Sequence, residues 1–199
     1  MSEGPDRVDL APSMVRRERR WWPVIAALVT IAVVVLGGYV TAAALSEPAG
    51  PPVGVQGVVT VGPLSGWETA IEQPFADGAF VRLSRGSGSL DIVVVRAGIS
   101  STDEELAAWY RDQVLSVQLD ELSVSDRLET ARLDSGRAAL RFVYIGVDGV
   151  SGGAVEGEVT LLVTSSGAGV VLDGFAPGGL LGFSISDIRT MVDAAEVAG

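Results

Sequence analysis

The sequence of 199 residues contains no cysteine, histidine, lysine or asparagine. Without cysteine there is no disulfide, thiolate nucleophile, iron–sulfur cluster or cysteine-ligated zinc site. Without histidine and lysine there is no Ser-His triad, imidazole metal ligand, Schiff base or P-loop lysine. The chemistry left to the chain is that of carboxylates, hydroxyl groups, arginine and the backbone, and these residues form no specific catalytic motif.

The charge of the chain is strongly negative. All 14 basic side chains are arginines, against 25 aspartates and glutamates, so the formal net charge is -11. A nucleic-acid-binding protein needs a basic surface that displaces counterions from phosphates. The composition therefore predicts no nucleic-acid partner.

One long apolar run, residues 24–45, contains no charged side chain. As an α-helix it would be about 33 Å long, close to the thickness of about 30 Å of a bilayer's hydrocarbon core. The run predicts a transmembrane helix and a single-pass protein of the cell membrane. The alanines at 42–44 also fit a signal-peptidase site, so a cleaved secretory signal is the alternative.

A basic cluster and two tryptophans precede the run, and we assign them as the residues of membrane anchoring and topology: Arg16, Arg17, Arg19, Arg20, Trp21 and Trp22. Arginines stay on the cytoplasmic side of a bilayer, and tryptophan favours the headgroup layer. The N-terminus is therefore predicted to be cytoplasmic and the C-terminal part extracytoplasmic. Gly38 and Ala42 have the spacing of a close helix–helix contact, so a homodimer through the membrane helix is a further hypothesis.

Composition divides the rest of the chain into three parts. Residues 1–23 are polar and aperiodic and predict a disordered cytoplasmic tail that carries the basic cluster. Residues 46–63 contain four prolines and four glycines and predict a semi-extended stalk, with residues 58–61 as an optional edge strand. Residues 64–199 are numerous enough to bury a core without disulfides and predict one extracytoplasmic domain.

Periodic patterns predict an α+β domain with about six antiparallel strands and two packed helices. Strands are predicted at 80–84, 90–95, 128–133, 138–147, 155–164 and 169–175, with residues 66–71 as a possible further short strand and helices at about 101–117 and 186–197. The short turns between strands favour antiparallel pairing, because parallel neighbours need long crossovers.

The first of these helices has a recognisable start. Thr102 and Glu105 have the spacing of a capping box. The apolar residues that follow at helical spacing predict an inner face: Leu106, Tyr110, Val114 and Val117.

The order of elements resembles that of the Mog1/PsbP-like α/β sandwiches. The residues that carry the resemblance are Gly66-Trp67 near the start, the Ser135-Gly136 turn before an aromatic strand, and the final helix, so it covers about residues 64–197. The resemblance implies a scaffold-like or partner-binding domain on an envelope protein. It transfers no catalytic residue.

Two aspartates lie inside apolar strands, where a carboxylate must be solvated or paired. These are Asp91 and Asp173, and we expect both on the exposed face of the sheet, opposite Arg82, Arg96 or Arg141. Two carboxylates around a sugar cleft are also the requirement for glycoside hydrolysis. The pair is therefore the candidate for the alternative function.

Other polar clusters have ordinary structural explanations. Asp148, Glu156 and Glu158 flank a glycine-rich loop and offer oxygen ligands for Ca²⁺, but the EF-hand pattern is absent and Asp-Gly is a common turn pair. We assign no metal, cofactor or catalytic residue. Trp67 is expected in the core.

The sequence thus predicts a membrane-anchored extracytoplasmic protein of the bacterial cell envelope that binds or scaffolds an envelope protein. The alternatives are a carboxylate-dependent cell-wall hydrolase and a sensor whose short cytoplasmic tail recruits a partner.

Overall fold

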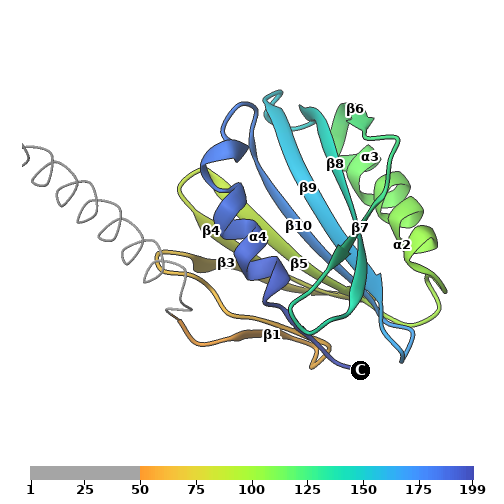
Figure 1. The fold of residues 1–199 in the computed structure, drawn as a ribbon. Helices are drawn as coiled ribbons and strands as arrows, with labels where there is room; N and C mark the ends of the chain where they lie inside the picture. Colours follow the sequence, from red (N-terminus) through yellow and green to blue (C-terminus); the bar gives the residue numbers. More distant parts are fainter. Residues whose placement is uncertain (1–49) are drawn as a thin grey trace, which may run out of the picture. The chain divides into compact units, whose positions relative to one another are not determined.

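Antiparallel strands are the main elements of the computed structural model, which describes residues 50–199 (Figure 1). The main sheet contains β3 (Glu68–Phe75), β4 (Gly78–Arg85), β5 (Gly88–Val95), β6 (Leu119–Val124), β7 (Glu129–Arg132), β8 (Ala138–Asp148), β9 (Ala154–Val163) and β10 (Gly169–Pro177). A small second sheet contains β1 (Val53–Val55), β2 (Val59–Val61) and β11 (Glu196–Val197). The helical segments are α2 (Asp103–Tyr110), η2 (Arg111–Leu115), α3 (Ser116–Gln118), η3 (Leu181–Phe183) and α4 (Ile185–Asp193).

The strands of the main sheet follow the order β3-β4-β5-β10-β9-β8-β6, and β7 is a further partner of β8. All of these pairings are antiparallel. The predicted α+β class with an antiparallel sheet is therefore confirmed. The predicted number of about six strands is wrong, because the sheet has eight.

The strand of the main sheet that the sequence patterns miss is β6, which lies in a segment where no strand was predicted. It lies at the edge of the sheet and leaves Asp120 and Glu121 exposed. Its register with β8 breaks between Asp120 and Ser123, and Glu121 adopts a left-handed φ of 49°. A strand of this kind has no alternation of apolar and polar residues, which is the signal on which strand prediction depends.

The other edge strand, β3, starts close to its predicted position and runs on to Phe75. Its eight residues are all exposed. Because neither face of β3 is covered, its sequence shows no alternation beyond the predicted end at residue 71.

Helix α2 starts as its sequence predicts. The backbone N–H of Glu105 donates to the Thr102 hydroxyl oxygen over 3.2 Å, and the Glu105 carboxylate accepts from the N–H of Ser101 over 2.7 Å. The first contact satisfies a donor that the first helical turn leaves without a partner, and the predicted capping role of Thr102 is confirmed. Glu105 accepts from Ser101, the residue before the N-cap, rather than from Thr102.

The inner face of this helix is predicted correctly for one turn and then changes phase. Leu106 and Tyr110 are buried, but Val117 is 78% exposed and Leu115 is buried in its place. The cause is the π-helical segment η2, because each π turn contains more residues than an α turn and rotates the following side chains. The prediction of Val117 as a core residue is wrong.

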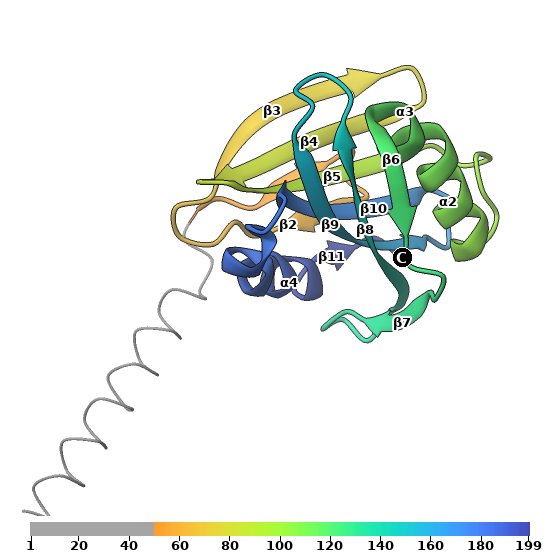
Figure 2. The ribbon, with the colours of Figure 1, turned by 90° about the horizontal axis from the view of Figure 1, so that it is seen from above.

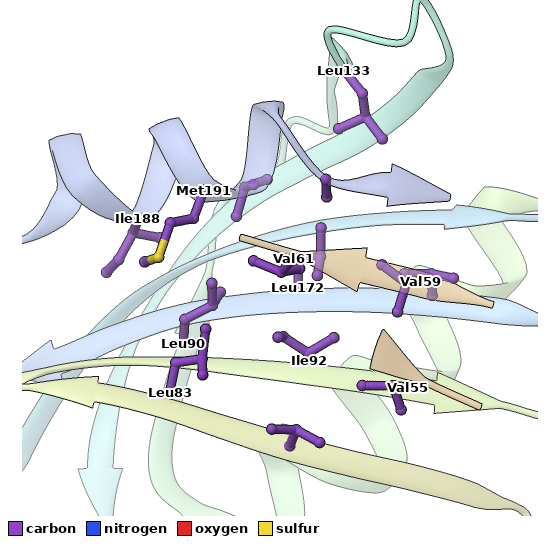
Figure 3. Packing of buried hydrophobic residues seen from close by; sticks show 14 of the residues in the cluster. Val55, Val59, Val61, Leu83, Leu90, Ile92, Leu133, Leu172, Ile188 and Met191 are labelled. Carbon is purple, nitrogen blue, oxygen red and sulfur yellow. The ribbon is translucent and has the colours of Figure 1, made fainter. Parts of the chain in front are cut away.

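The main sheet separates two apolar cores (Figures 1 and 2). One core lies between the sheet and α2, around Leu106, Phe142 and Leu161. The other lies between the sheet and α4 together with the small sheet, and Figure 3 shows its residues, among them Leu90 and Met191. Alternate residues of the central strands face opposite cores, as period-two geometry requires.

The segment predicted as a stalk belongs to the second core for part of its length. Val55, Val59 and Val61 are buried, and Figure 3 shows them beside Leu172 and Ile92. Strand β2 pairs with β1 on one side and with β11 on the other. The folded part therefore begins before residue 64, because the valines between the prolines and glycines supply an apolar face.

The closing helix α4 packs Ile188, Met191 and Val192 into the same core. It ends at Asp193, earlier than predicted, and the chain continues into β11.

The N-terminal predictions concern residues that lie outside the described part of the chain. They are the tail at 1–23, the membrane helix at 24–45, the close contact at Gly38 and Ala42, and the anchor residues before the run. Between residues 50 and 199, no helix is long and apolar enough to cross a membrane.

Replacing Val61 by alanine should show that the strand segment is part of the fold. Val61 is fully buried, so Val61→Ala should lower the free energy of unfolding by about 2 kcal/mol, the contribution of a buried valine side chain. Thr60→Ala, at the neighbouring and partly exposed position, is the control and should lower the free energy of unfolding by clearly less. Urea unfolding followed by tryptophan fluorescence measures both, and equal losses would show that residues 59–61 do not contribute to the core.

Candidate functional site

An ion pair lies on the face of the sheet that α2 partly covers. Arg82 of β4 and Asp91 of β5 are direct cross-strand neighbours. The guanidinium donates from Nε to Asp91 Oδ1 over 2.6 Å and from Nη2 to Oδ2 over 2.7 Å. Such a bidentate pair fixes both side chains. The predicted pairing of Asp91 with Arg82 is confirmed, but the expected exposed position is wrong, because the Asp91 side chain is 14% exposed.

Asp173 lies next to this pair and is more deeply buried. Its register partner on β5 is Asp91, so the two carboxylates project from directly opposed positions of neighbouring strands. The Tyr110 hydroxyl of α2 donates to Oδ2 over 2.7 Å, and the Tyr144 hydroxyl of β8 donates to Oδ1 over 3.0 Å. The expectation that Asp173 lies on an exposed face is wrong, because tyrosine hydroxyls replace water here.

The protonation of this cluster follows from burial. Removal from water raises the pKa of Asp173 to about 7, and the nearby negative charge of Asp91 adds to the effect, while the two tyrosine hydroxyls oppose it. Burial also raises the pKa of Asp91, and the hydrogen bonds from Arg82 oppose that rise. Burial raises the pKa of Tyr110 far above its ordinary value, so this hydroxyl keeps its proton as a donor.

Two further contacts hold the cluster in place. The Arg82 guanidinium carbon lies 5.0 Å from the centre of the Phe175 ring, within range of a cation–π interaction. The Tyr144 ring lies against the backbone of Gly157, where a Cβ atom would overlap the ring. Glycine at 157 therefore leaves the space that brings the Tyr144 hydroxyl to Asp173.

A groove of about 250 Å³ opens above the ion pair, between the helical segment and strands β3 to β5. Its lining is mainly apolar and aromatic, with the ion pair as part of its floor: Phe75, Phe80, Arg82, Asp91, Val93, Trp109, Tyr110, Val114 and Gln118. Binding sites combine this kind of apolar wall with a few polar groups. Tyr110 belongs to both the groove and the polar cluster, because its ring lines the groove and its hydroxyl donates to Asp173.

The arrangement favours binding over carboxylate catalysis. Both oxygens of Asp91 accept from Arg82, and both oxygens of Asp173 accept from tyrosines below the surface. Glycoside hydrolysis needs one carboxyl group on each side of a substrate bond. Asp173 is 3% exposed and does not line the groove.

The acids around the glycine-rich loop do not form one site. Asp148 accepts from the backbone N–H groups of Val150 and Ser151 in its own loop. Glu156 accepts from the N–H of Leu181, and Glu158 is buried against Arg189. Within residues 50–199, no group of three acidic side chains is placed to hold a metal ion.

The remaining sequence candidates have structural roles. Trp67 is buried, as predicted, and its indole N–H donates to Asp187 over 3.3 Å. Arg141 pairs with Glu158 and Asp193 rather than with the central aspartates. Asp103, in the first turn of α2, accepts from the N–H of Val163 over 2.7 Å.

Sequence reasoning identified the two aspartates but not the residues that surround them. Tyr144 lies in a strand where phenylalanine would fit the pattern equally well, and Tyr110 was expected only as a core residue. A hydroxyl on a buried ring needs a partner. An aspartate in an apolar strand needs partners as well, so the two requirements together could have suggested that the tyrosine hydroxyls bind Asp173.

The raised pKa of Asp173 gives a pH dependence of stability with a defined sign. The folded state binds the proton more tightly than the unfolded chain, where an aspartate titrates near about 4. Stability should therefore fall as the pH rises from about 4 to about 7, the folded pKa of Asp173. Asp173→Asn should remove most of this slope in urea unfolding between pH 4 and pH 8. Asp126→Asn, on an exposed loop, is the control, and an unchanged slope in Asp173→Asn would contradict the assignment.

The ion pair should show strong coupling in a double-mutant cycle. Arg82→Met leaves the buried Asp91 carboxylate without its donors and should lower the free energy of unfolding by about 1–3 kcal/mol. Adding Asp91→Leu should recover most of this loss, because the unpaired charge is then gone. Additive losses from the two changes would show that the side chains do not act as a pair.

The comparison with known proteins is informative at the level of the fold. No protein-family model and no curated protein sequence matches the chain. Among solved structures, LpqN of Mycobacterium tuberculosis aligns with a TM-score of 0.54 and 11% identity, over 76% of this chain and 86% of that chain. Cyanobacterial PsbP (CyanoP) of Synechocystis sp. PCC 6803 aligns with a TM-score of 0.51 and 13% identity, over 76% of this chain and 96% of that chain.

The Ran-binding protein Mog1p of Saccharomyces cerevisiae also aligns, with a TM-score of 0.49 and 12% identity, over 76% of this chain and 96% of that chain. Identities this low concern the fold alone. The structural matches to LpqN and CyanoP support a Mog1/PsbP-like fold, so the resemblance predicted from the order of elements is confirmed.

Proposed function

We propose that this chain is a single-pass membrane protein of the bacterial cell envelope whose extracytoplasmic domain binds an envelope protein. The observation that carries the proposal is the aromatic groove above the Arg82–Asp91 pair. The partner occupies this groove with a large apolar side chain.

The chemistry of the groove supports a protein side chain as its occupant. Phe75 is 37% exposed, and the side chains of Phe80 and Trp109 are partly exposed. Covering apolar surface contributes about 25 cal/mol per Å². Interface hot spots are typically single large side chains in pockets of this kind. The charges on the floor already neutralise each other, so an uncharged apolar group enters without leaving a charge unpaired.

Strand β3 lies beside the groove and supplies Phe75. It is the edge strand of the main sheet. Its acidic residues, Pro74 and the register break between Thr69 and Ile71 are features that discourage pairing with another strand. Side-chain insertion into the groove, rather than addition of a strand to β3, is therefore the mode of contact we propose.

The membrane topology rests on the sequence. The arginines at positions 16–20 favour the cytoplasmic side, and the apolar run at 24–45 is long enough to cross. From Glu47 onward there are 21 acids against 9 arginines, so the small basic excess lies before the run. An extracytoplasmic domain is consistent with the role stated for LpqN, which is described as involved in cell envelope biogenesis.

Cell-wall hydrolysis is the second candidate, because Asp91 and Asp173 are opposed on neighbouring strands. The hydrogen bonds that fill all four carboxylate oxygens favour the binding function. Turnover of wall polymer by the purified full chain, lost in Asp91→Asn, would favour hydrolysis instead.

A photoreactive phenylalanine analogue at position 80 tests the binding proposal. In the native membrane it should form a covalent product with one envelope protein, because residue 80 lies inside the groove. The product should disappear when Trp109→Ala removes the opposite wall. The matched control is the same analogue at Val143, which is also apolar but 49% exposed and outside the groove. An identical product from position 143, or one that persists in Trp109→Ala, would contradict the proposal.

A further inference from the structure

The most exposed large apolar side chains of the described domain lie in three separate segments. Val150 is 98% exposed, Phe183 is 84% exposed and Val117 is 78% exposed. Single exposed apolar residues are common on protein surfaces. The relative positions of these three side chains therefore decide whether they form one surface.

All three segments lie at the same end of the main sheet. Val150 is in the loop between β8 and β9, and the N–H of Gly149 in that loop donates to the carbonyl of Gln118, the neighbour of Val117. Strand β10 ends beside the same hairpin, where the N–H of Gly178 donates to the carbonyl of Ala154, and the chain then reaches Phe183. Figure 1 shows the β8–β9 connection and the α3 and β6 segments close together at the top of the domain.

The opposite end of the sheet has a different surface. There the β9–β10 turn contains Ser165 and Ser166, and the β7–β8 turn contains Asp134 and Ser135. Leu128 and Phe75, the large apolar side chains exposed near that end, are only 41% and 37% exposed. The apolar character therefore belongs to one end of the domain, and clustered exposed apolar surface marks an interaction site.

The chain enters the domain on the side of the segment that carries Phe183. Gly50 lies against Pro63, which leads to Trp67. The Trp67 ring lies close to Gly88, where Ser184 also approaches, and its indole donates to Asp187. The first described residues are thus connected through Trp67 to the segment that carries Phe183.

The connection between the predicted membrane helix and the first strand is short. The apolar run ends at Leu45, and Gly50 already lies against Pro63 of the domain, so residues 46–49 form the whole connection. The extended chain from residue 45 to residue 50 reaches at most about 18 Å. A domain on such a tether stays next to the bilayer, close enough for its apolar end to touch lipid.

From this geometry we infer that the apolar end of the domain rests on the outer surface of the membrane, with Val117, Val150 and Phe183 in the boundary between headgroups and acyl chains. The inference rests on the membrane anchoring proposed above. Apolar side chains at this depth contribute binding energy in proportion to the area they bury.

The charges at this end specify the kind of lipid. Asp120 and Glu121 are exposed there, and Glu156 lies beside the hairpin. Arg85, at the β4–β5 turn, is neutralised by Asp187 over 2.7 Å. Negative lipid headgroups would repel these acids. The surface therefore fits zwitterionic lipid better than anionic lipid.

The absence of cysteine makes a direct test practical. Val150→Cys and Phe183→Cys, each labelled with an environment-sensitive nitrobenzoxadiazole dye, are reconstituted as full chains in phosphatidylcholine vesicles that contain doxyl-labelled lipid. Leu128→Cys, apolar and at the opposite end, is the matched control. The dyes at 150 and 183 should shift their emission to the blue and lose most of it to the quencher, whereas the dye at 128 should not.

The outcomes separate this inference from the anchoring on which it rests. Alkaline carbonate washing of the same vesicles reports whether the chain is inserted. An inserted chain whose dyes at 150 and 183 are not quenched, or are quenched no more than the dye at 128, overturns the membrane contact and leaves the anchor standing. A chain released by carbonate overturns both.

A change of lipid tests the charge argument independently. Vesicles enriched in phosphatidylglycerol should reduce the quenching at 150 and 183 because of the acids at this end. Stronger quenching in these vesicles would overturn the assignment of a zwitterionic surface.

Discussion

The buried carboxylate of Asp173, held by the hydroxyls of Tyr110 and Tyr144, is the contact on which the rest of the domain depends. It joins α2, β8 and β10 at a point from which water is excluded. Burying a carboxylate there costs free energy unless its oxygens accept hydrogen bonds. The two tyrosine rings must therefore keep their positions, and Gly157 must remain without a side chain so that the Tyr144 ring fits against it. Because Tyr110 also lines the groove, the same contact sets the distance between helix and sheet where a partner would bind.

The polar cluster and the groove have different roles in the domain. The ion pair and the tyrosine-bound aspartate form the floor, and the aromatic rings above it form the surface that we propose for recognition. This arrangement fits a binding role better than a hydrolytic one, since the carboxylates are committed to internal partners. The apolar end of the domain is a separate surface, formed by the β8–β9 loop and the short helical segments α3 and η3, and we propose that it rests on the bilayer.

Sequence patterns predicted the parts of the fold that carry a clear local signal. Burial alternates along the β4–β5 hairpin and β8, strands β9 and β10 are apolar and buried for most of their length, and α2 begins with a capping residue. The end of β3 lacks such a signal because both of its faces are exposed, and β6 lacks it because the break in its register with β8 interrupts the alternation. Val117 was misplaced because a π-helical turn leaves no mark in the spacing of apolar residues. The candidate aspartates were identifiable as unusual, and Arg82 was one of three arginines expected opposite them. The burial of Asp173 could not be foreseen, because its partners come from Tyr110 and Tyr144, far away in the sequence.

Carboxyl-carbon NMR on protein with ¹³C-labelled aspartate measures the central contact most directly. The Asp173 resonance, assigned by its loss in the Asp173→Asn variant, should titrate near pH 7 in the folded protein, because burial raises its pKa to about 7. A titration at about pH 4, the ordinary value for aspartate, would contradict the account, because burial would then not dominate the pKa of Asp173.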